Sequence, residues 1–186
     1  MAGCSHLILS LFFGSILFRD LKPDNIGLGF DDNIKVFDFG LAKELKKEDR
    51  LEEDQYHATE QTGTQRYMAP EVYLSQVYGL PADNYSFAVI LWEMMSLKIP
   101  FGNMDAREHV RSAFEKKQRP KLRYHRWPEE VKRLIKYGWS HRPVNRKKVD
   151  IVYKSLAMFL ESRGWTVTDT KAEFLSDRMD LGNSSD

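Results

Sequence analysis

The chain has 186 residues, of which 42% are hydrophobic and 30% charged, and its 28 Lys and Arg against 27 Asp and Glu give a net charge of +1. This composition is typical of a soluble globular domain and excludes collagen-like, low-complexity and wholly disordered chains. The single cysteine, Cys4, cannot form an internal disulfide, which favours a reducing, cytoplasmic compartment.

The first expected element is an apolar segment at residues 1–17. Residues 7–18 read LILSLFFGSILF, which is too short to span a bilayer. A secretory signal would require Lys or Arg before this apolar run, and residues 1–6 contain neither. We therefore interpret residues 1–17 as the end of a buried helix or strand, or as a misassigned start of the chain, and expect no membrane partner.

A short hairpin and a polar loop follow. Ile26, Leu28 and Phe30 alternate with other residues, residues 31–33 supply turn-forming side chains, and the alternation resumes at residue 34, which predicts a β-hairpin. Residues 43–61 carry four basic and seven acidic side chains and show no apolar stripe. We therefore expect a solvated loop there.

Three helices are predicted in the second half of the chain. Apolar residues from 87 to 95 recur at helical spacing and predict one buried face, with Asp83 at the expected N-cap. Two further helices are predicted from Pro128 to Gly138 and from residue 149 to 160. Residues 162–186 show little periodicity and are expected to be a disordered tail.

Three motifs carry chemistry, and their order and spacing are informative. Residues 19–25 read RDLKPDN, in which an Asp precedes an Asn by five positions; residues 38–40 read DFG, and residues 69–71 read APE. With these motifs, residues 18–161 resemble the C-terminal lobe of the eukaryotic protein kinases. The resemblance implies a mainly α fold, a kinase-like C-lobe with a short β-hairpin that carries the catalytic and metal-binding loops.

The resemblance also implies roles for five residues. Asp20 would accept or orient the proton of the substrate hydroxyl, and Lys22 would neutralise charge on the transferring phosphate. Thr64 would contact both of them. Asn25 and Asp38 would hold Mg²⁺ and, together with Lys22, bind ATP. A lysine at position 22 is typical of kinases that act on Ser and Thr.

The segment that ends at residue 71 resembles a kinase activation segment. Arg19, directly before Asp20, indicates regulation by phosphate, because an arginine can pair with a phosphorylated loop residue. Thr59 and Thr62 are the candidate sites for an upstream kinase, although each also fits an ordinary solvated loop. Tyr56 is a weaker candidate.

Two scaffold contacts follow from the same resemblance. Asp83 would accept hydrogen bonds from the backbone of the catalytic loop, and Arg146 would form a buried ion pair with Glu71. Four positions depart from the kinase pattern, of which Ala88 and Lys147 do not touch the chemistry. Phe18 replaces the usual histidine before the Arg-Asp pair, and Gly27 replaces an apolar side chain that would otherwise pack under adenine.

Nothing upstream of residue 18 resembles the Gly-rich loop, the lysine or the helix αC glutamate of a kinase small lobe. The sequence thus predicts one half of an ATP site, from a truncated Ser/Thr protein kinase domain that transfers the γ-phosphate of ATP to a protein substrate with Mg²⁺. The alternatives are a catalytically inactive kinase-like binding or scaffold module and an incomplete gene product.

A basic region spans residues 107–148, with 15 Lys and Arg against 4 Asp and Glu and with aromatic residues interleaved. A nucleic-acid-binding face is one interpretation. We favour ordinary solvated helix faces, because the charges do not form one clear stripe, and expect no nucleic-acid partner. The five histidines show no spacing typical of a zinc site.

Overall fold

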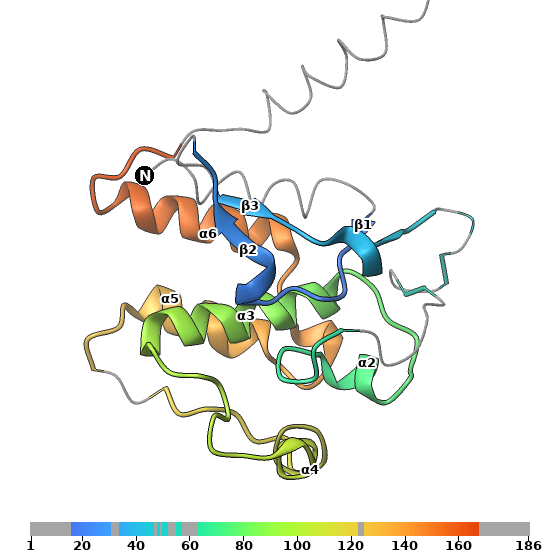
Figure 1. Ribbon diagram of the computed structural model, residues 1–186. Coiled ribbons are helices and arrows are strands. Elements are labelled where there is room, and N and C mark those ends of the chain that lie inside the picture. Colours follow the sequence, from blue (N-terminus) through green and yellow to red (C-terminus); the bar gives the residue numbers. More distant parts are fainter. Residues whose placement is uncertain are drawn as a thin grey trace, which may run out of the picture.

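The computed structural model describes residues 16–30, 34–46, 48, 50–51, 55–56, 63–122 and 125–167. Over these ranges the chain is mainly helical, as the sequence predicts, and it contains two small sheets, one more than predicted (Figure 1). The strands are β1 (Ile16–Leu17), β2 (Ile26–Leu28), β3 (Ile34–Val36) and β4 (Lys43–Glu44). The helices are α2 (Pro70–Tyr73), α3 (Pro81–Ser96), α4 (Ala106–His109), α5 (Glu129–Gly138) and α6 (Val149–Glu161). Short 3-10 turns η1 (Pro23–Asn25), η2 (Phe39–Leu41) and η6 (Pro143–Asn145) and a π-helical segment η5 (Val110–Glu115) complete the list.

Each sheet has two antiparallel strands. In one, Ile16 of β1 pairs with Glu44 of β4. In the other, Ile26 of β2 pairs with Val36 of β3, and both pack against the core. Since side chains alternate along a strand, Gly27 and its partner Lys35 lie on the opposite, outer face of the second sheet.

The loop predicted at residues 43–61 is partly wrong. Residues 43 and 44 form β4, Leu45 is buried, and Tyr56 is buried while it exchanges backbone hydrogen bonds of 3.1 and 3.3 Å with Tyr78. Single apolar residues in a charged run show no periodicity, so the sequence pattern did not reveal them. Residues 16–17 of the apolar opening form the short strand β1.

Several expectations concern residues outside the described ranges. They are the first fifteen positions of the apolar segment, the hairpin turn at 31–33, Thr59, Thr62 and positions 168–186 of the expected tail.

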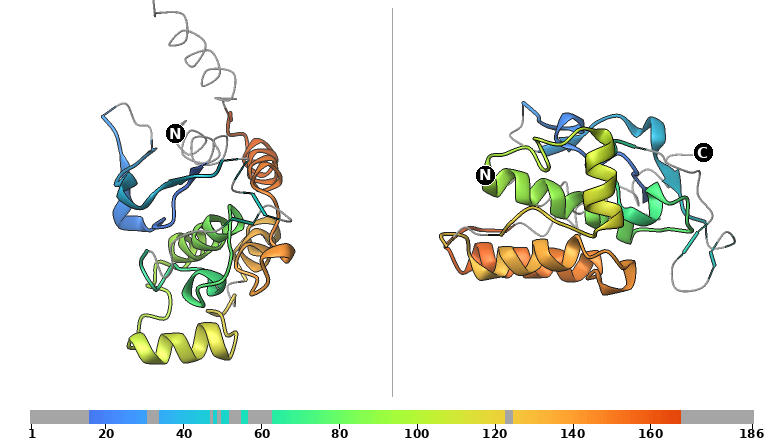
Figure 2. Two further views of the ribbon diagram at one scale, coloured as in Figure 1. Left: turned by 90° about the vertical axis from the view of Figure 1, so that its right-hand side faces the viewer. Right: turned by 90° about the horizontal axis from the view of Figure 1, so that it is seen from below.

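Helix α3 lies at the centre, between the strands on one side and the α5–α6 pair on the other (Figure 2). The prediction of a single buried face at residues 87–95 is partly wrong. Of the predicted residues, Ile90 is buried and Leu91 and Met95 pack against the core, but the burial is not confined to that face. Tyr85, Val89 and Trp92 are buried, whereas Met94 is exposed and Phe87 is only half-buried. A helix that is covered on several sides buries more than one stripe, so its periodicity does not identify one core face.

The start of α3 also differs from the prediction. The helix begins at Pro81, so Asp83 lies in its first turn and is not the N-cap. Asp83 is buried, and its carboxylate is used in a contact with a distant loop.

Helices α5 and α6 confirm the other two predicted helices. Gly138, the last residue of α5, lies against Ala88 of α3 so closely that a Cβ on the glycine would be 2.6 Å from the Ala88 methyl carbon. The glycine therefore permits the close approach of α5 to α3. Helix α6 packs in turn against α5.

Helix α4 was not predicted. Asp105 and Glu108 form a reciprocal capping box, in which the Asp105 carboxylate accepts from Glu108 N at 2.8 Å and the Glu108 carboxylate accepts from Asp105 N at 3.1 Å.

Across the residues that the structure describes, no helix has the length and apolar character needed to cross a membrane.

Candidate active site

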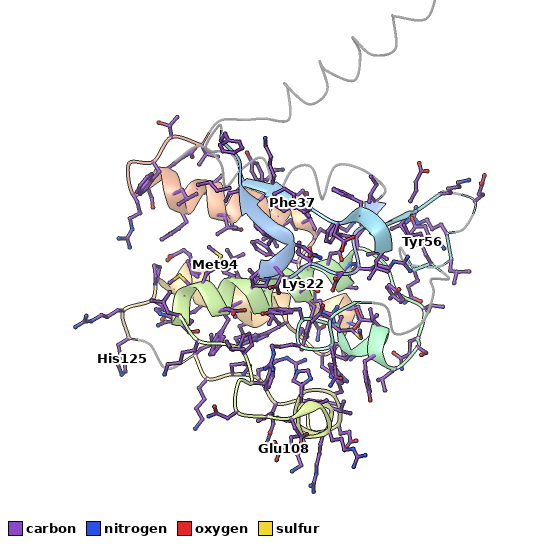
Figure 3. All side chains as sticks on the ribbon, in the orientation of Figure 1. Lys22, Phe37, Tyr56, Met94, Glu108 and His125 are labelled. Carbon is purple, nitrogen blue, oxygen red and sulfur yellow. The ribbon has the colours of Figure 1, made fainter. Side chains whose placement is uncertain are left out.

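The carboxylate of Asp20 is the centre of the site. Its Oδ1 accepts hydrogen bonds from the backbone N and the Oγ1 of Thr64, both at 2.7 Å. Its Oδ2 accepts from Lys22 Nζ at 2.8 Å and from Asn25 Nδ2 at 3.2 Å. The structure thus brings together four of the five site residues predicted from the sequence, and Lys22 is labelled in Figure 3.

These contacts fix the charge state of Asp20. Burial alone would raise the pKa of its carboxyl, but hydrogen bonds from Lys22 and Thr64 outweigh that effect and hold the pKa below its usual value. Lys22 Nζ also donates to Thr64 Oγ1 at 3.0 Å, so the hydroxyl accepts from the lysine while it donates to the aspartate. The site therefore holds an ionised carboxylate at neutral pH, next to the side-chain nitrogen of Lys22.

Asp83 positions the loop that carries Asp20. Its buried carboxylate accepts from Phe18 N at 2.7 Å and from Arg19 N at 3.0 Å, which confirms the predicted contact with this backbone. Burial raises the pKa of Asp83 to about 6, although the two backbone hydrogen bonds act in the opposite direction.

The backbone of the same loop is in the left-handed region at Arg19, which has a φ of 71°. Gly63, with a φ of 109°, lies against the carbonyl oxygen of Arg19, and a Cβ on residue 63 would collide with that oxygen.

Asn25 is held by its amide nitrogen. Nδ2 donates to the carbonyl oxygen of Asp20 at 3.0 Å as well as to its carboxylate. The amide oxygen is consequently the atom of Asn25 that suits a cation.

Among the described residues, Asp38 is not hydrogen-bonded to the Asp20 cluster. It is exposed, has a φ of 58°, and accepts a hydrogen bond from Gly40 N at 3.2 Å. The next residue, Phe39, packs its ring edge-on against Phe18, with 5.3 Å between ring centroids. Within the described part of the chain, the two predicted metal ligands, Asn25 and Asp38, are therefore not hydrogen-bonded to each other.

The donor chemistry of Asn25 and Asp38 fits Mg²⁺. Both offer hard oxygen atoms, and Mg²⁺ in nucleotide sites commonly takes one or two protein oxygens and completes its shell with phosphate and water oxygens. Within the described ranges, no group of three or more His, Cys, Asp or Glu side chains could hold a metal ion by itself. A magnesium ion here would therefore need the phosphates of its nucleotide as further ligands.

The predicted ion pair between Glu71 and Arg146 is confirmed. Two parallel contacts join them, Arg146 NH1 to Glu71 Oε1 at 2.6 Å and NH2 to Oε2 at 2.8 Å, and both side chains are buried. Arg146 also donates to the carbonyl oxygens of Ser140 and Pro81, each at 2.9 Å. The pair ties the start of α2 to the loop before α6.

Sequence reasoning missed how the segment after Thr64 is anchored. The hydroxyl of Tyr67 donates to Glu93 of α3 at 2.7 Å, and burial, followed by this carboxylate, raises the pKa of Tyr67. Gln65 Nε2 donates to the carbonyl oxygen of Ala106 at 2.8 Å, and Arg66 donates to that of Pro100. No spacing in the sequence links these distant partners.

Comparisons with known proteins assign most of the chain to one family. The protein kinase domain family matches residues 8–157. The chain is 38% identical over 130 residues to serine/threonine-protein kinase VIK of Arabidopsis thaliana, an alignment that covers 67% of this chain and 28% of the relative. It is 35% identical over 152 residues to serine/threonine-protein kinase 12 of the same plant, with 80% and 32% covered. It is 32% identical over 139 residues to dual specificity protein kinase shkC of Dictyostelium discoideum, with 74% and 26% covered.

The chain spans about a third or less of the length of these relatives. The match nevertheless includes the Asp20 loop, residues 38–40, the Glu71–Arg146 pair and helix α3 within one family domain. This chain therefore belongs to the eukaryotic protein kinase superfamily.

Proposed function

We propose that this chain carries the catalytic loop of a Ser/Thr protein kinase, which transfers the γ-phosphate of ATP to a hydroxyl group of a protein substrate with Mg²⁺. The observation that carries the proposal is the Asp20 carboxylate, held by Lys22, Thr64 and Asn25 through contacts of 2.7 to 3.2 Å. A buried, ionised carboxylate with a neighbouring ammonium group suits proton acceptance beside a transferring phosphate.

Each residue of the cluster then has one task. Asp20 orients the attacking hydroxyl and accepts its proton as the new oxygen–phosphorus bond forms. The bond from the γ-phosphorus to the β–γ bridging oxygen breaks in the same step, and ADP leaves with that oxygen. Lys22 places a positive charge beside the phosphoryl oxygens, and Thr64 keeps the aspartate and the lysine in register through its hydroxyl. This division of work is positioning plus electrostatic stabilisation, which dominates phosphoryl transfer.

Asn25 and Asp38 would hold the magnesium ion, which neutralises charge on the β- and γ-phosphates when bound. The amide oxygen of Asn25 and the exposed carboxylate of Asp38 are the available ligands. In the structure Asp38 is bonded to Gly40 N, so we propose that it turns toward Asn25 when nucleotide is present.

Regulation and location complete the proposal. Arg19 donates through Nε to the carbonyl oxygen of Leu41 at 2.5 Å, near the start of the activation segment. An upstream kinase acting on Thr59 or Thr62 would add a dianion that suits an arginine partner. We further propose a cytoplasmic site of action, on protein Ser and Thr residues.

A catalytically inactive binding module is the second candidate. The observation that favours it is the position of Asp38, which is exposed and bonded to its own turn instead of to the Asp20 cluster. In that case the chain would retain the family scaffold and would bind other proteins without transferring phosphate.

Thermal unfolding with and without Mg·ATP separates the two candidates. A ligand that binds only the folded chain raises the unfolding midpoint, and nucleotide at a hundred times its Kd adds about 2.7 kcal/mol to the free energy of unfolding. The enzyme is expected to show this rise and to transfer phosphate to a generic Ser/Thr substrate. Asp20→Asn should keep the rise and lose the transfer, whereas Glu129→Gln, on an exposed helix turn, serves as a matched acidic control. No rise at millimolar Mg·ATP would contradict the enzyme assignment.

A further inference from the structure

Phe37 occupies an unusual place on the outer face of the β2–β3 sheet. It follows Lys35 by two residues, so both side chains lie on the face opposite the core-facing Val36. Its ring lies directly over Gly27, where the Cε2 atom of Phe37 overlaps the position that a Cβ of residue 27 would take. The missing side chain of the glycine thus makes room for the aromatic ring.

The ring remains open to solvent on its other side. Phe37 is 48% exposed although it lies across a strand backbone. Figure 3 labels it at the end of β3, on the same side of α3 as Lys22. An aromatic surface with one face packed and the other accessible is suited to stack a planar ring.

Phe37 also adjoins both proposed magnesium ligands. Its backbone N donates to the carbonyl oxygen of Asn25 at 2.8 Å, and Asp38 is the next residue in the chain. In a nucleotide whose phosphates are bound through these two residues, the α-phosphate and the ribose lead from the phosphates to the base, and the Phe37 ring extends from the backbone beside the two ligands. The exposed ring is therefore within reach of the base.

We propose that the ring of Phe37 is the surface on which this chain stacks the purine base of its nucleotide, in place of a side chain at Gly27. The proposal rests on the proposed function, because it uses the same phosphate-binding residues. It identifies a residue that determines nucleotide affinity, and it predicts that the base, not the phosphates, depends on Phe37.

Titration calorimetry with two ligands tests this, using Mg·ATP and magnesium tripolyphosphate, which lacks the base. Stacking of one base on an aromatic ring contributes enough free energy that Phe37→Ala should weaken ATP about tenfold. Tripolyphosphate should bind Phe37→Ala as it binds the wild type. Trp165→Ala is a matched control, since Trp165 is 45% exposed but lies beyond α6.

An exchange of side chains provides the second variant. Gly27→Leu alone would collide with the Phe37 ring, whereas Gly27→Leu combined with Phe37→Ala places an apolar side chain in the vacated space. The double variant should recover most of the ATP affinity that Phe37→Ala loses. An NMR spectrum supplies a readout independent of affinity, because stacking on Phe37 should shift the adenine H2 and H8 signals upfield and Phe37→Leu should abolish that shift.

The outcomes distinguish this proposal from the proposed function. If wild type binds both ligands and Phe37→Ala weakens ATP alone, the stacking role is supported. If Phe37→Ala leaves ATP affinity unchanged, or weakens both ligands equally while the unfolding midpoint is unchanged, the stacking role is wrong and the phosphate site stands. If wild type binds neither ligand, both proposals are overturned.

Discussion

The hydroxyl of Thr64 connects Asp20, the proposed proton acceptor, to Lys22, the lysine proposed to bind phosphate. It donates to Asp20 at 2.7 Å and accepts from Lys22 at 3.0 Å. Thr64→Val keeps the side-chain shape and removes both contacts, so we expect the rate of phosphoryl transfer to fall by about tenfold or more. Since a hydrogen bond that favours the ionised form is lost, the pKa of Asp20 should rise.

A pH–rate profile measures both effects. The acidic limb for Thr64→Val should move to higher pH, because Asp20 then protonates more readily, while Thr64→Ser should restore most of the rate and the wild-type limb. A Thr64→Val protein with an unchanged rate and an unchanged acidic limb would show that the hydroxyl does not serve Asp20.

The raised pKa of Asp83 should make the folded chain less stable as pH rises, the opposite of what an ordinary ion-paired carboxylate does. The pKa of its carboxyl is about 6 in the folded chain, against the ordinary 3.8. The folded chain therefore retains a proton that the unfolded chain releases, and the stability from this group is complete below pH 3.8 and is lost as pH rises through about 6. The difference corresponds to roughly 3 kcal/mol, since one pKa unit is about 1.4 kcal/mol.

Urea unfolding of wild type and Asp83→Asn between pH 4 and pH 7 isolates this contribution. The amide does not titrate, so the stability of wild type relative to Asp83→Asn should decline over that range. Subtracting the two curves removes the pH dependence of all other groups. Parallel curves would mean that the Asp83 carboxyl is ionised throughout.

At the scale of elements, sequence reasoning succeeded where one local pattern decides the structure. Helices α5 and α6 have clear apolar stripes and bordering Gly or Pro residues, and the motif around Asp20 is identified by its resemblance to the kinase catalytic loop. It failed where tertiary contacts decide. Strand β4 exists because β1 pairs with it, and the buried sides of α3 depend on the elements around that helix. The overlap of Phe37 with Gly27 likewise depends on the β2–β3 register, which no single strand reveals.

The Glu71–Arg146 pair is a buried, two-contact link between elements 75 residues apart in sequence. Arg146→Met leaves the buried Glu71 carboxylate without its partner, and we expect the free energy of unfolding to fall by about 3–5 kcal/mol. Glu71→Gln together with Arg146→Met removes both charges and should cost less than the sum of the single variants.

Chemical denaturation of the two single variants and the double variant measures this coupling. Lys132→Ala is the matched control, because Lys132 pairs with exposed Glu129 and such pairs contribute less than about 1 kcal/mol. Strictly additive losses across the cycle would show that the two buried side chains do not depend on each other.

At the scale of the whole molecule, the described surface carries a mostly apolar groove at the end of α3, in which Glu93 and Lys98 are the charged residues. Met94, Leu97 and Ile99 line it together with Pro23 and Ile26, and Leu97 is 89% exposed. Apolar surface gathered in this way favours association between molecules. We therefore expect the isolated chain to self-associate through this groove as its concentration rises.

The variant Leu97→Asn with Ile99→Ser tests that expectation without weakening the fold. Leu97 has a φ of 52°, in the left-handed region that Asn tolerates better than Leu, so the variant should unfold at the same temperature or higher. Sedimentation velocity over a concentration series should show less association than in wild type. Val144→Ser, at an exposed residue of η6, is the control and should associate like wild type. Equal association in all three proteins would exclude the groove as the contact, because only one of the variants removes its apolar lining.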